Sequence, residues 1–227
     1  MTKACKISLF AVALLFLSVA PAAFADSATL TLTGAGSNVV DGVYVGPYTA
    51  TIAGTPGSVQ VICDDYTHES FVGETWNAYV SSFPGLTNVR FTGSSETQNY
   101  DEVAYLANNL FNLGGTNNPE ADALQFAIWD LFDPSAIAPS TCFGAVAQDC
   151  VNYWLTAAES QSYYAGEFSN ILIYTPESGG NPQEFIVRTP EPGALLLLFL
   201  GLAGLLLLKG LTSGEDCSFR WGKSVLN

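Results

Sequence analysis

The sequence predicts an α+β fold, an antiparallel β-sandwich or barrel with a helical insertion. Short segments rich in β-branched and aromatic residues occupy the first and last thirds of the central region, and segments with helical periodicity lie between them. Because the helical segments interrupt a run of strands rather than alternate with strands, the order favours an antiparallel sheet. We expect one domain over residues 26–188.

Six strands account for the β part of this prediction. The expected strands are 28–33, 48–53, 59–63, 76–81, 171–174 and 184–188. In the third of them Val59, Val61 and Cys63 alternate with other residues, so their side chains share one face of the sheet. This face is apolar and should point into the core.

Three helices are expected in the middle of the domain. Residues 99–111 carry apolar side chains at helical spacing. In the second helix, 119–132, Asn118 supplies an N-cap, Pro119 fits the first helical position, and Asp133-Pro134 ends the helix. The third helix should cover 149–164.

The charge of the chain excludes one class of partner. The 227 residues include 7 Lys and Arg against 21 Asp and Glu, a formal net charge of -14. Such a chain repels phosphate backbones, so nucleic acid is not an expected partner. The low charged fraction with many polar uncharged residues is typical of an exported β-rich domain.

The first 25 residues have the pattern of a signal peptide. Lys3 and Lys6 make a positive start, an apolar run follows over residues 7–20, and Ala23 and Ala25 satisfy the small-residue rule for cleavage. We therefore expect export, with a mature chain that begins at Asp26.

The C-terminal region carries a short motif before an apolar helix. Pro190, Glu191 and Pro192 lead into an uncharged stretch over residues 193–208, which Lys209 closes, and we expect this stretch to enter a membrane. Residues 189–209 resemble the PEP-CTERM sorting signal of Gram-negative bacteria. The resemblance implies processing by an exosortase-type enzyme and delivery to the cell surface or extracellular matrix. The tail at 210–227 departs from the family, which usually ends in a cluster of basic residues.

Five cysteines divide by position. Cys5 lies in the signal peptide and Cys217 lies beyond the apolar helix. Cys142 and Cys150 are close enough in sequence to form a disulfide in an oxidising compartment. Cys63 remains as the odd cysteine, either a small core residue or a chemically employed thiol.

A second residue gives Cys63 a chemical interpretation. Gln125 opens the sequence Gln-Phe-Ala-Ile-Trp, which ends at Trp129 on the second expected helix. A strand-end cysteine with a downstream Gln-x-Ala-Ile-Trp resembles the thioester domains of bacterial surface adhesins. The resemblance implies an internal thioester between Cys63 and Gln125, with Trp129 shielding the bond. Leu124 stands where that family usually has Thr, and the alternative is that Gln125 is an ordinary helix residue.

These patterns lead to one preferred function and two alternatives. The preferred interpretation is an exported surface protein, not an enzyme, which attaches covalently to an amine- or hydroxyl-bearing protein or glycan. The first alternative is a non-reactive structural component of an exopolysaccharide or biofilm matrix. The second is a secreted cysteine hydrolase in which His68 activates Cys63, although no oxyanion site is recognisable.

No metal or cofactor site is expected. Asp64, Asp65 and Glu69 lie close together, but their spacing does not match an EF-hand loop. We interpret them as solvated carboxylates of a turn. No phosphate-binding loop, zinc-spaced cysteine set or dinucleotide fingerprint is present in the sequence.

Overall fold

The protein is described by a computed structural model that covers residues 27–36, 38–40, 42–93, 96–114, 118–136, 141–142, 145–178, 180–189 and 199–204, excluding the side chains of 96, 97 and 141–148. The chain divides into two compact units, 1–188 and 189–227. The predicted signal peptide, the Pro190-Glu191-Pro192 motif and the tail at 210–227 lie outside the described residues.

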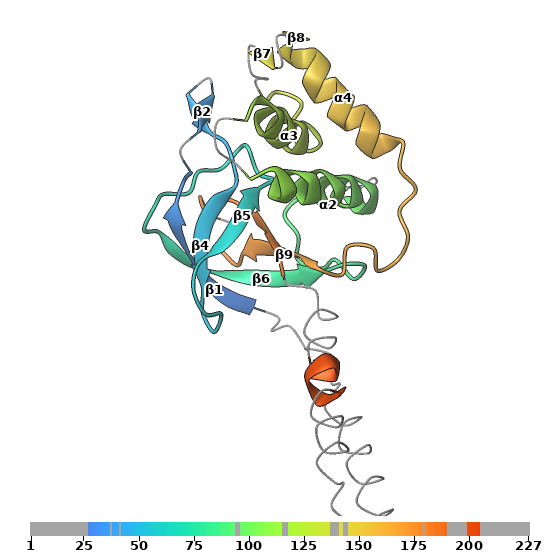
Figure 1. Ribbon diagram of the computed structural model, residues 1–227. Helices are drawn as coiled ribbons and strands as arrows, with labels where there is room; N and C mark the ends of the chain where they lie inside the picture. Colours follow the sequence, from blue (N-terminus) through green and yellow to red (C-terminus); the bar gives the residue numbers. More distant parts are fainter. Residues whose placement is uncertain are drawn as a thin grey trace, which may run out of the picture. The chain divides into compact units, whose positions relative to one another are not determined.

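The first unit is built on a closed antiparallel barrel of six strands (Figure 1). Around the barrel the order is β1-β4-β5-β10-β9-β6. The strands are β1 (Ser27–Gly34), β4 (Tyr48–Ile52), β5 (Val59–Cys63), β6 (Thr75–Ser82), β9 (Ile171–Pro176) and β10 (Phe185–Arg188). Closure leaves no unpaired sheet edge, so the barrel needs no covering for its edges.

Three helices follow β6 in the sequence and precede β9. They are α2 (Glu96–Leu113), α3 (Pro119–Asp130) and α4 (Ala147–Glu159), and they pack against one another on one side of the barrel (Figure 1). Two small hairpins complete the unit: β2 (Val39–Val40) with β3 (Val43–Tyr44), and β7 (Thr141–Cys142) with β8 (Ala145–Val146).

Two apolar clusters stabilise these layers. One fills the barrel and includes Leu30, Val61 and Phe185, each fully buried. The other lies between the sheet and the helices and includes Ile62 and Leu124. Alternation along β5 explains the division, because Val61 and Cys63 point into the barrel while Ile62 between them points to the helices. The end of β5 is therefore close to both cores.

The start of α3 forms as its sequence predicts. Asn118 has an extended backbone, and its side-chain oxygen accepts a hydrogen bond from the Glu120 backbone N–H at 3.0 Å. Pro119 occupies the first helical turn, where its missing N–H costs nothing. From Ala123 to Trp129 every side chain of α3 is buried, so the helix is held on more than one face. This packing fixes the positions of Gln125 and Trp129.

The structure confirms the α+β class and resolves the choice between sandwich and barrel in favour of the barrel. All six expected strands form, within two residues at each end. The predicted end of the third helix at residue 164 is wrong, because α4 ends at Glu159 and Gln161 donates its backbone N–H to the Ala158 carbonyl in a tighter turn. Neither small hairpin was expected.

Apart from residue 189, the second unit is described only at residues 199–204. These residues are helical, and Phe199, Leu200 and Leu202 expose large apolar side chains. No helix within the described ranges is long and apolar enough to cross a membrane. The expected membrane segment at 193–208 falls mostly outside the described residues and stays a prediction.

Candidate functional site

The fold brings Cys63 and Gln125 together. Cys63 ends β5, Gln125 lies in the middle of α3, and both residues are completely buried. The Gln125 side-chain nitrogen Nε2 donates a hydrogen bond to the Cys63 carbonyl at 2.7 Å. Two residues that lie 62 positions apart in the sequence thus meet where the barrel adjoins the helical layer. Cys63 is a free thiol in this structure.

The other end of the Gln125 carboxamide is held by the chain before β4. The Gly46 backbone N–H donates to Gln125 Oε1 at 3.2 Å. A Cβ atom at Gly46 would lie 2.6 Å from this oxygen, closer than atoms pack, so the contact requires glycine. Both polar ends of the carboxamide therefore bond to backbone groups, which fixes its orientation and leaves its carbonyl carbon between them.

The Cys63 thiol also has a defined environment. Its sulfur donates to the Asp65 carbonyl at 3.1 Å and accepts from the Asp65 N–H at 3.3 Å. Burial raises the pKa of the thiol well above its usual value, and the charges of Asp64 and Asp65 raise it further. The Asp65 N–H and the Trp129 indole act in the opposite direction. In this closed state the protonated thiol is the favoured form.

Aromatic side chains surround the pair. Trp129 is 2% exposed, and its ring lies 5.2 Å from that of Tyr66 and 5.1 Å from that of Phe126. The Trp129 N–H has no well-aligned hydrogen-bond partner among the described residues, although the indole lies close enough to Cys63 to affect its pKa. Tyr48 lies beside Gly46, and its hydroxyl donates to the Tyr44 carbonyl at 2.6 Å. The pair is thereby shielded from water.

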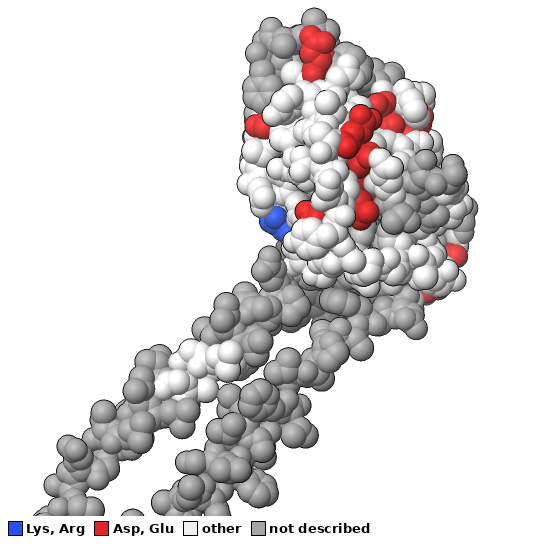
Figure 2. Space-filling model, turned by 90° about the vertical axis from the view of Figure 1, so that its right-hand side faces the viewer, with Lys and Arg blue, Asp and Glu red and all other residues white. Residues whose placement is uncertain are grey.

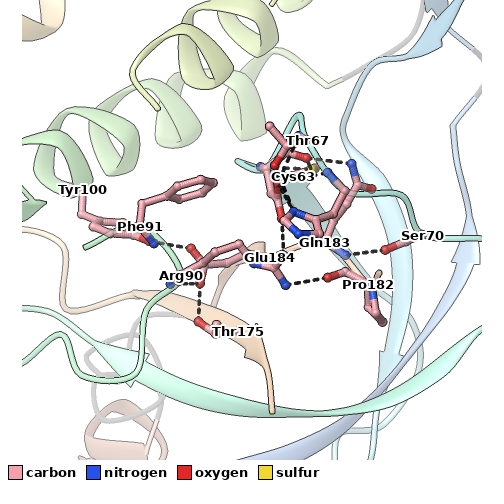
Figure 3. A network of polar contacts seen from close by, with 12 residues as sticks. Cys63, Thr67, Ser70, Arg90, Phe91, Tyr100, Thr175, Pro182, Gln183 and Glu184 are labelled. Atoms are coloured by element: carbon pink, nitrogen blue, oxygen red, sulfur yellow. Dashed lines mark hydrogen bonds and ion pairs between the residues drawn. The ribbon is translucent and has the colours of Figure 1, made fainter. Parts of the chain in front are cut away.

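The next two residues, Asp64 and Asp65, belong to a charged network. The prediction that they are solvated turn carboxylates is wrong, because both are fully buried. Asp65 pairs with the Arg90 guanidinium at 3.0 Å (Figure 3). The same guanidinium donates to the Pro182 carbonyl at 2.7 Å. The Asp65 carboxylate can be buried because the Arg90 guanidinium, from a later segment of the chain, replaces part of its hydration.

Asp64 lies against Glu184 at the centre of this network. The Glu184 carboxylate accepts hydrogen bonds from the Tyr100 hydroxyl, the Arg90 backbone N–H and the Thr175 hydroxyl (Figure 3). Asp64 has no comparable donors, and burial raises its pKa well above 3.8, with the charge of Glu184 adding to the effect. Of the two, Asp64 is therefore the carboxyl that more strongly favours its protonated form.

The remaining expected site residues are distributed as follows. His68 Nδ1 bonds to Asp65 Oδ1 at 3.0 Å, and no contact between His68 and the Cys63 thiol is found among the described residues. Glu69 is exposed. Cys150 is disulfide-bonded, but the side chain of Cys142 lies outside the described residues, so the Cys142–Cys150 pairing stays a prediction.

Sequence reasoning missed several residues of the site. Gly46 precedes Pro47 in what reads as an ordinary turn, and nothing local indicates that its N–H meets a glutamine 79 residues later. Arg90, Tyr100 and Glu184 come from three separate segments and carry no spacing signal. The one available clue is that Asp64 and Asp65 continue directly from an apolar strand.

No protein-family model matches the chain, and no curated protein matches it. Among solved structures, the chain is similar to the N-terminal thioester domain of a surface protein from Clostridium perfringens. The sequence identity is 12% and the TM-score is 0.41, over 71% of this chain and 97% of that chain. We transfer no residue role from that protein to this one.

Proposed function

We propose that this chain is an exported cell-surface protein that forms an internal thioester between Cys63 and Gln125 and uses it to attach covalently to a partner. One observation carries the proposal: a buried carboxamide is held at both ends, by the Gly46 N–H and the Cys63 carbonyl, at the end of the strand whose last residue, Cys63, is a buried free thiol.

The proposed bond forms by attack of the thiol on the carboxamide. The Cys63 sulfur attacks the Gln125 carbonyl carbon, a C–S bond forms, and the C–N bond breaks. The thiol proton goes to the departing nitrogen, which leaves as ammonia. The Gly46 N–H already points at the oxygen that gains negative charge during the attack, so it needs no rearrangement to stabilise that charge.

Attachment is the second half of the chemistry. A primary amine of the partner attacks the same carbon, the C–S bond breaks, an amide bond to Gln125 forms, and a proton from the amine passes to the Cys63 sulfur. A hydroxyl would give an ester in the same way. The bond is made once for each chain, so the protein is a binding protein rather than an enzyme. The aromatic cover of Trp129 and Tyr66 keeps water from hydrolysing the thioester before a partner arrives.

Labelling with a small amine tests this function. We expect a biotin-linked primary amine to become covalently attached at Gln125 in the purified protein, with at most one label per chain. Cys63→Ser and Gln125→Ala should abolish labelling. Gln60→Ala, which removes an exposed glutamine of β5, is the matched control and should label like the wild type. Equal labelling of Cys63→Ser would show that the thiol is not needed.

One observation favours a second candidate, a non-reactive matrix component. The Cys63 sulfur bonds to both backbone groups of Asp65, and burial with two nearby carboxylates raises its pKa, which opposes the nucleophilic thiolate. If this arrangement persists, Cys63 is a core residue of a structural protein. A domain in which Cys63 is an unmodified thiol, alkylated by a thiol reagent once the protein is unfolded, and which takes up no amine would establish this candidate instead.

The proposed location depends on the two ends of the chain. We propose that residues 1–25 direct export, that 193–208 hold the chain in a membrane, and that an exosortase-type enzyme cuts near Pro190-Glu191-Pro192. Expression in a Gram-negative host with an exosortase tests this, with the C-terminal peptide of the released protein read by mass spectrometry. We expect a C-terminal peptide that ends near Glu191, and we expect this peptide to be absent from the Glu191→Ala variant. A chain that retains residues 210–227 at the surface would contradict it.

A further inference from the structure

The indole N–H of Trp129 is a buried donor without a well-aligned partner. Trp129 is 2% exposed, and its Nε1 atom forms no hydrogen bond within the part of the chain that the structure describes. A buried N–H that loses water without a replacement costs free energy, and nearly all such groups in folded proteins are paired. Shielding a thioester from water requires only the apolar faces of the ring, so shielding does not explain the N–H.

The position of Trp129 on α3 brings its ring close to Cys63. Trp129 follows Gln125 by four residues, so the two side chains lie on the same face of the helix, one turn apart. Gln125 contacts the Cys63 backbone through Nε2. Tyr66, three residues after Cys63, packs its ring against that of Trp129 at 5.2 Å. The indole therefore lies between α3 and the segment that follows Cys63.

Two ring contacts hold the indole in one orientation. Phe126 packs edge-on against it at 5.1 Å, with the ring planes at 86°, and Tyr66 contacts it with the planes at 51°. Because side chains in a core interdigitate closely, a ring that is held by two others does not turn freely. The direction of the Trp129 N–H is thus fixed before any reaction begins.

The Cys63 sulfur is the group near the indole that has a use for this donor. It already accepts a hydrogen bond from the Asp65 N–H at 3.3 Å. Burial and the charges of Asp64 and Asp65 raise the pKa of the thiol, whereas the Asp65 N–H and the Trp129 indole lower it. A neutral sulfur accepts hydrogen bonds weakly, and an ionised acceptor accepts them more strongly. The indole N–H is therefore of most use when the sulfur is charged.

We propose that the Trp129 indole N–H donates a hydrogen bond to the Cys63 sulfur while that sulfur carries negative charge, and that Trp129 and the Asp65 N–H together stabilise the thiolate during acyl transfer. This inference rests on the proposed thioester function and adds a named donor to it. Trp129 then has two separate roles: its ring excludes water, and its N–H stabilises the charge on sulfur.

Negative charge reaches the sulfur in both steps of the proposed chemistry. In bond formation the Cys63 sulfur attacks the Gln125 carbonyl carbon as its proton is transferred to the departing ammonia. In attachment the amine nitrogen bonds to that carbon, the C–S bond breaks, and its electron pair stays on sulfur until a proton from the amine arrives. The Trp129 proton stays on its nitrogen throughout. A fixed donor lowers both barriers because it binds the charged sulfur more strongly than the neutral one.

Trp129→Phe tests the donor, because phenylalanine keeps an aromatic ring and has no N–H. The measurement is the rate at which methylamine opens the thioester of the purified protein, read from the intact mass as the gain of one methylamine. We expect Trp129→Phe to open about tenfold to a hundredfold more slowly than the wild type, since it loses one hydrogen bond to a charged group. Trp76→Phe is the matched control. It removes an unpartnered indole N–H inside the barrel and should open like the wild type.

The direction of the change separates a donor from a shield. If Trp129 only excluded water and solutes, the smaller phenylalanine ring would admit methylamine at least as easily. Trp129→Phe would then open as fast as the wild type or faster, and either result would overturn the proposal.

Surface charge does not disturb this comparison. Figure 2 shows Asp and Glu side chains gathered on one face of the molecule, with Lys and Arg atoms of the described residues only at its edge. With a net charge of -14, the protein concentrates a cationic amine near its surface, and the opening rate depends on salt. Trp129→Phe and Trp76→Phe leave every charge in place, so the ratio of their rates reports on the interior.

A second measurement applies even if Trp129→Phe folds poorly or carries no thioester. Proton–nitrogen NMR of the wild type follows the Trp129 indole N–H, assigned by its through-space contacts to Tyr66 and Phe126. The sulfur of a thioester shares its lone pair with the carbonyl and accepts a hydrogen bond less well than the freed sulfur. We therefore expect the Trp129 indole proton to move downfield when methylamine opens the bond, and the Trp76 indole proton to stay unchanged. An unchanged Trp129 proton would overturn the proposal.

The intact mass of the wild type distinguishes failure of this inference from failure of the proposed function. If the wild type lacks one ammonia and Trp129→Phe opens at the wild-type rate, the thioester stands and the donor role of Trp129 is overturned. If the wild type has its full calculated mass apart from disulfides, the thioester does not form, and the donor role is overturned with it.

Discussion

Cys63 directly precedes Asp64 in the sequence, and the Cys63–Gln125 pair is buried as completely as Asp64 and Asp65. The pair and the Asp64–Asp65 network are nevertheless held in different ways. The pair is uncharged, and its contacts go to backbone groups of Gly46, Cys63 and Asp65. The network is charged and depends on other side chains. Neutral groups held by backbone contacts can be buried at small cost and remain available for reaction. Charged groups need specific partners, so they contribute to fixing the fold.

The largest expected effect comes from breaking the network at Arg90. Arg90→Met keeps the length of the side chain but leaves the Asp65 carboxylate buried without its cation. We expect a loss of about 3–5 kcal/mol in the free energy of unfolding, measured by urea denaturation. Arg188→Met is the control. Arg188 bonds to Asn112 at an exposed site, so its loss should cost about 1 kcal/mol or less.

A change at the Cys63–Gln125 pair should affect amine labelling strongly and the free energy of unfolding less than Arg90→Met does. Gly46→Ala places a Cβ 2.6 Å from the Gln125 oxygen, so the carboxamide must turn away. We expect amine labelling to be lost and stability to fall by about 1–3 kcal/mol. Gly93→Ala, where nothing lies within 4 Å of the new Cβ, should label normally. Normal labelling of Gly46→Ala would show that the Gly46 contact is not needed.

The raised pKa of the buried Asp64 carboxyl predicts a pH effect on stability. Asp64 has a raised pKa in the folded state, so between 3.8 and that raised pKa the folded chain binds more protons than the unfolded chain. The contribution of Asp64 to the free energy of unfolding should therefore be fully present below about pH 4 and decline as the pH rises. Asp64→Asn keeps a hydrogen-bond donor toward Glu184 without a titrating proton. The variant should decline less steeply than the wild type in urea unfolding measured from pH 4 to 8, while other carboxyls with a raised pKa, such as Asp122 at about 6, keep their share of the decline.

A matched control isolates that effect. Glu69→Gln removes an exposed carboxylate four residues from Asp65 and should leave the pH dependence of the wild type unchanged. If Asp64→Asn declines with pH as steeply as the wild type, the proton is not held at this pair.

The smallest effect concerns the helix that carries Gln125. Asn118→Ala removes the side-chain oxygen that caps the Glu120 N–H. We expect a loss of about 1 kcal/mol in the free energy of unfolding. Amine labelling should persist, because the buried side chains from Ala123 to Trp129 still hold the helix in place. Loss of labelling would mean that the pair depends on the helix start as well as on packing.

The sequence was sufficient to predict the strands, the α+β class and the partners in the proposed reactive pair. Alternation along β5 placed Cys63 on the core face, and the cap at Asn118 located the helix of Gln125. Barrel closure could not be predicted, because it depends on the pairing of β1 with β6 and of β5 with β10, which are far apart in sequence. The burial of Asp64 and Asp65 was missed for the same reason, since Arg90 and Glu184 are distant along the chain.

The most direct test of the central claim is the intact mass of the purified native protein beside Cys63→Ala and Gln125→Ala variants. If the thioester forms, the wild type is lighter than its calculated mass by one ammonia, in addition to any change from disulfides, and neither variant shows this loss. If the wild type has the full calculated mass apart from disulfides, the Cys63–Gln125 bond does not form. The chain would then be a non-reactive surface or matrix protein with a buried thiol.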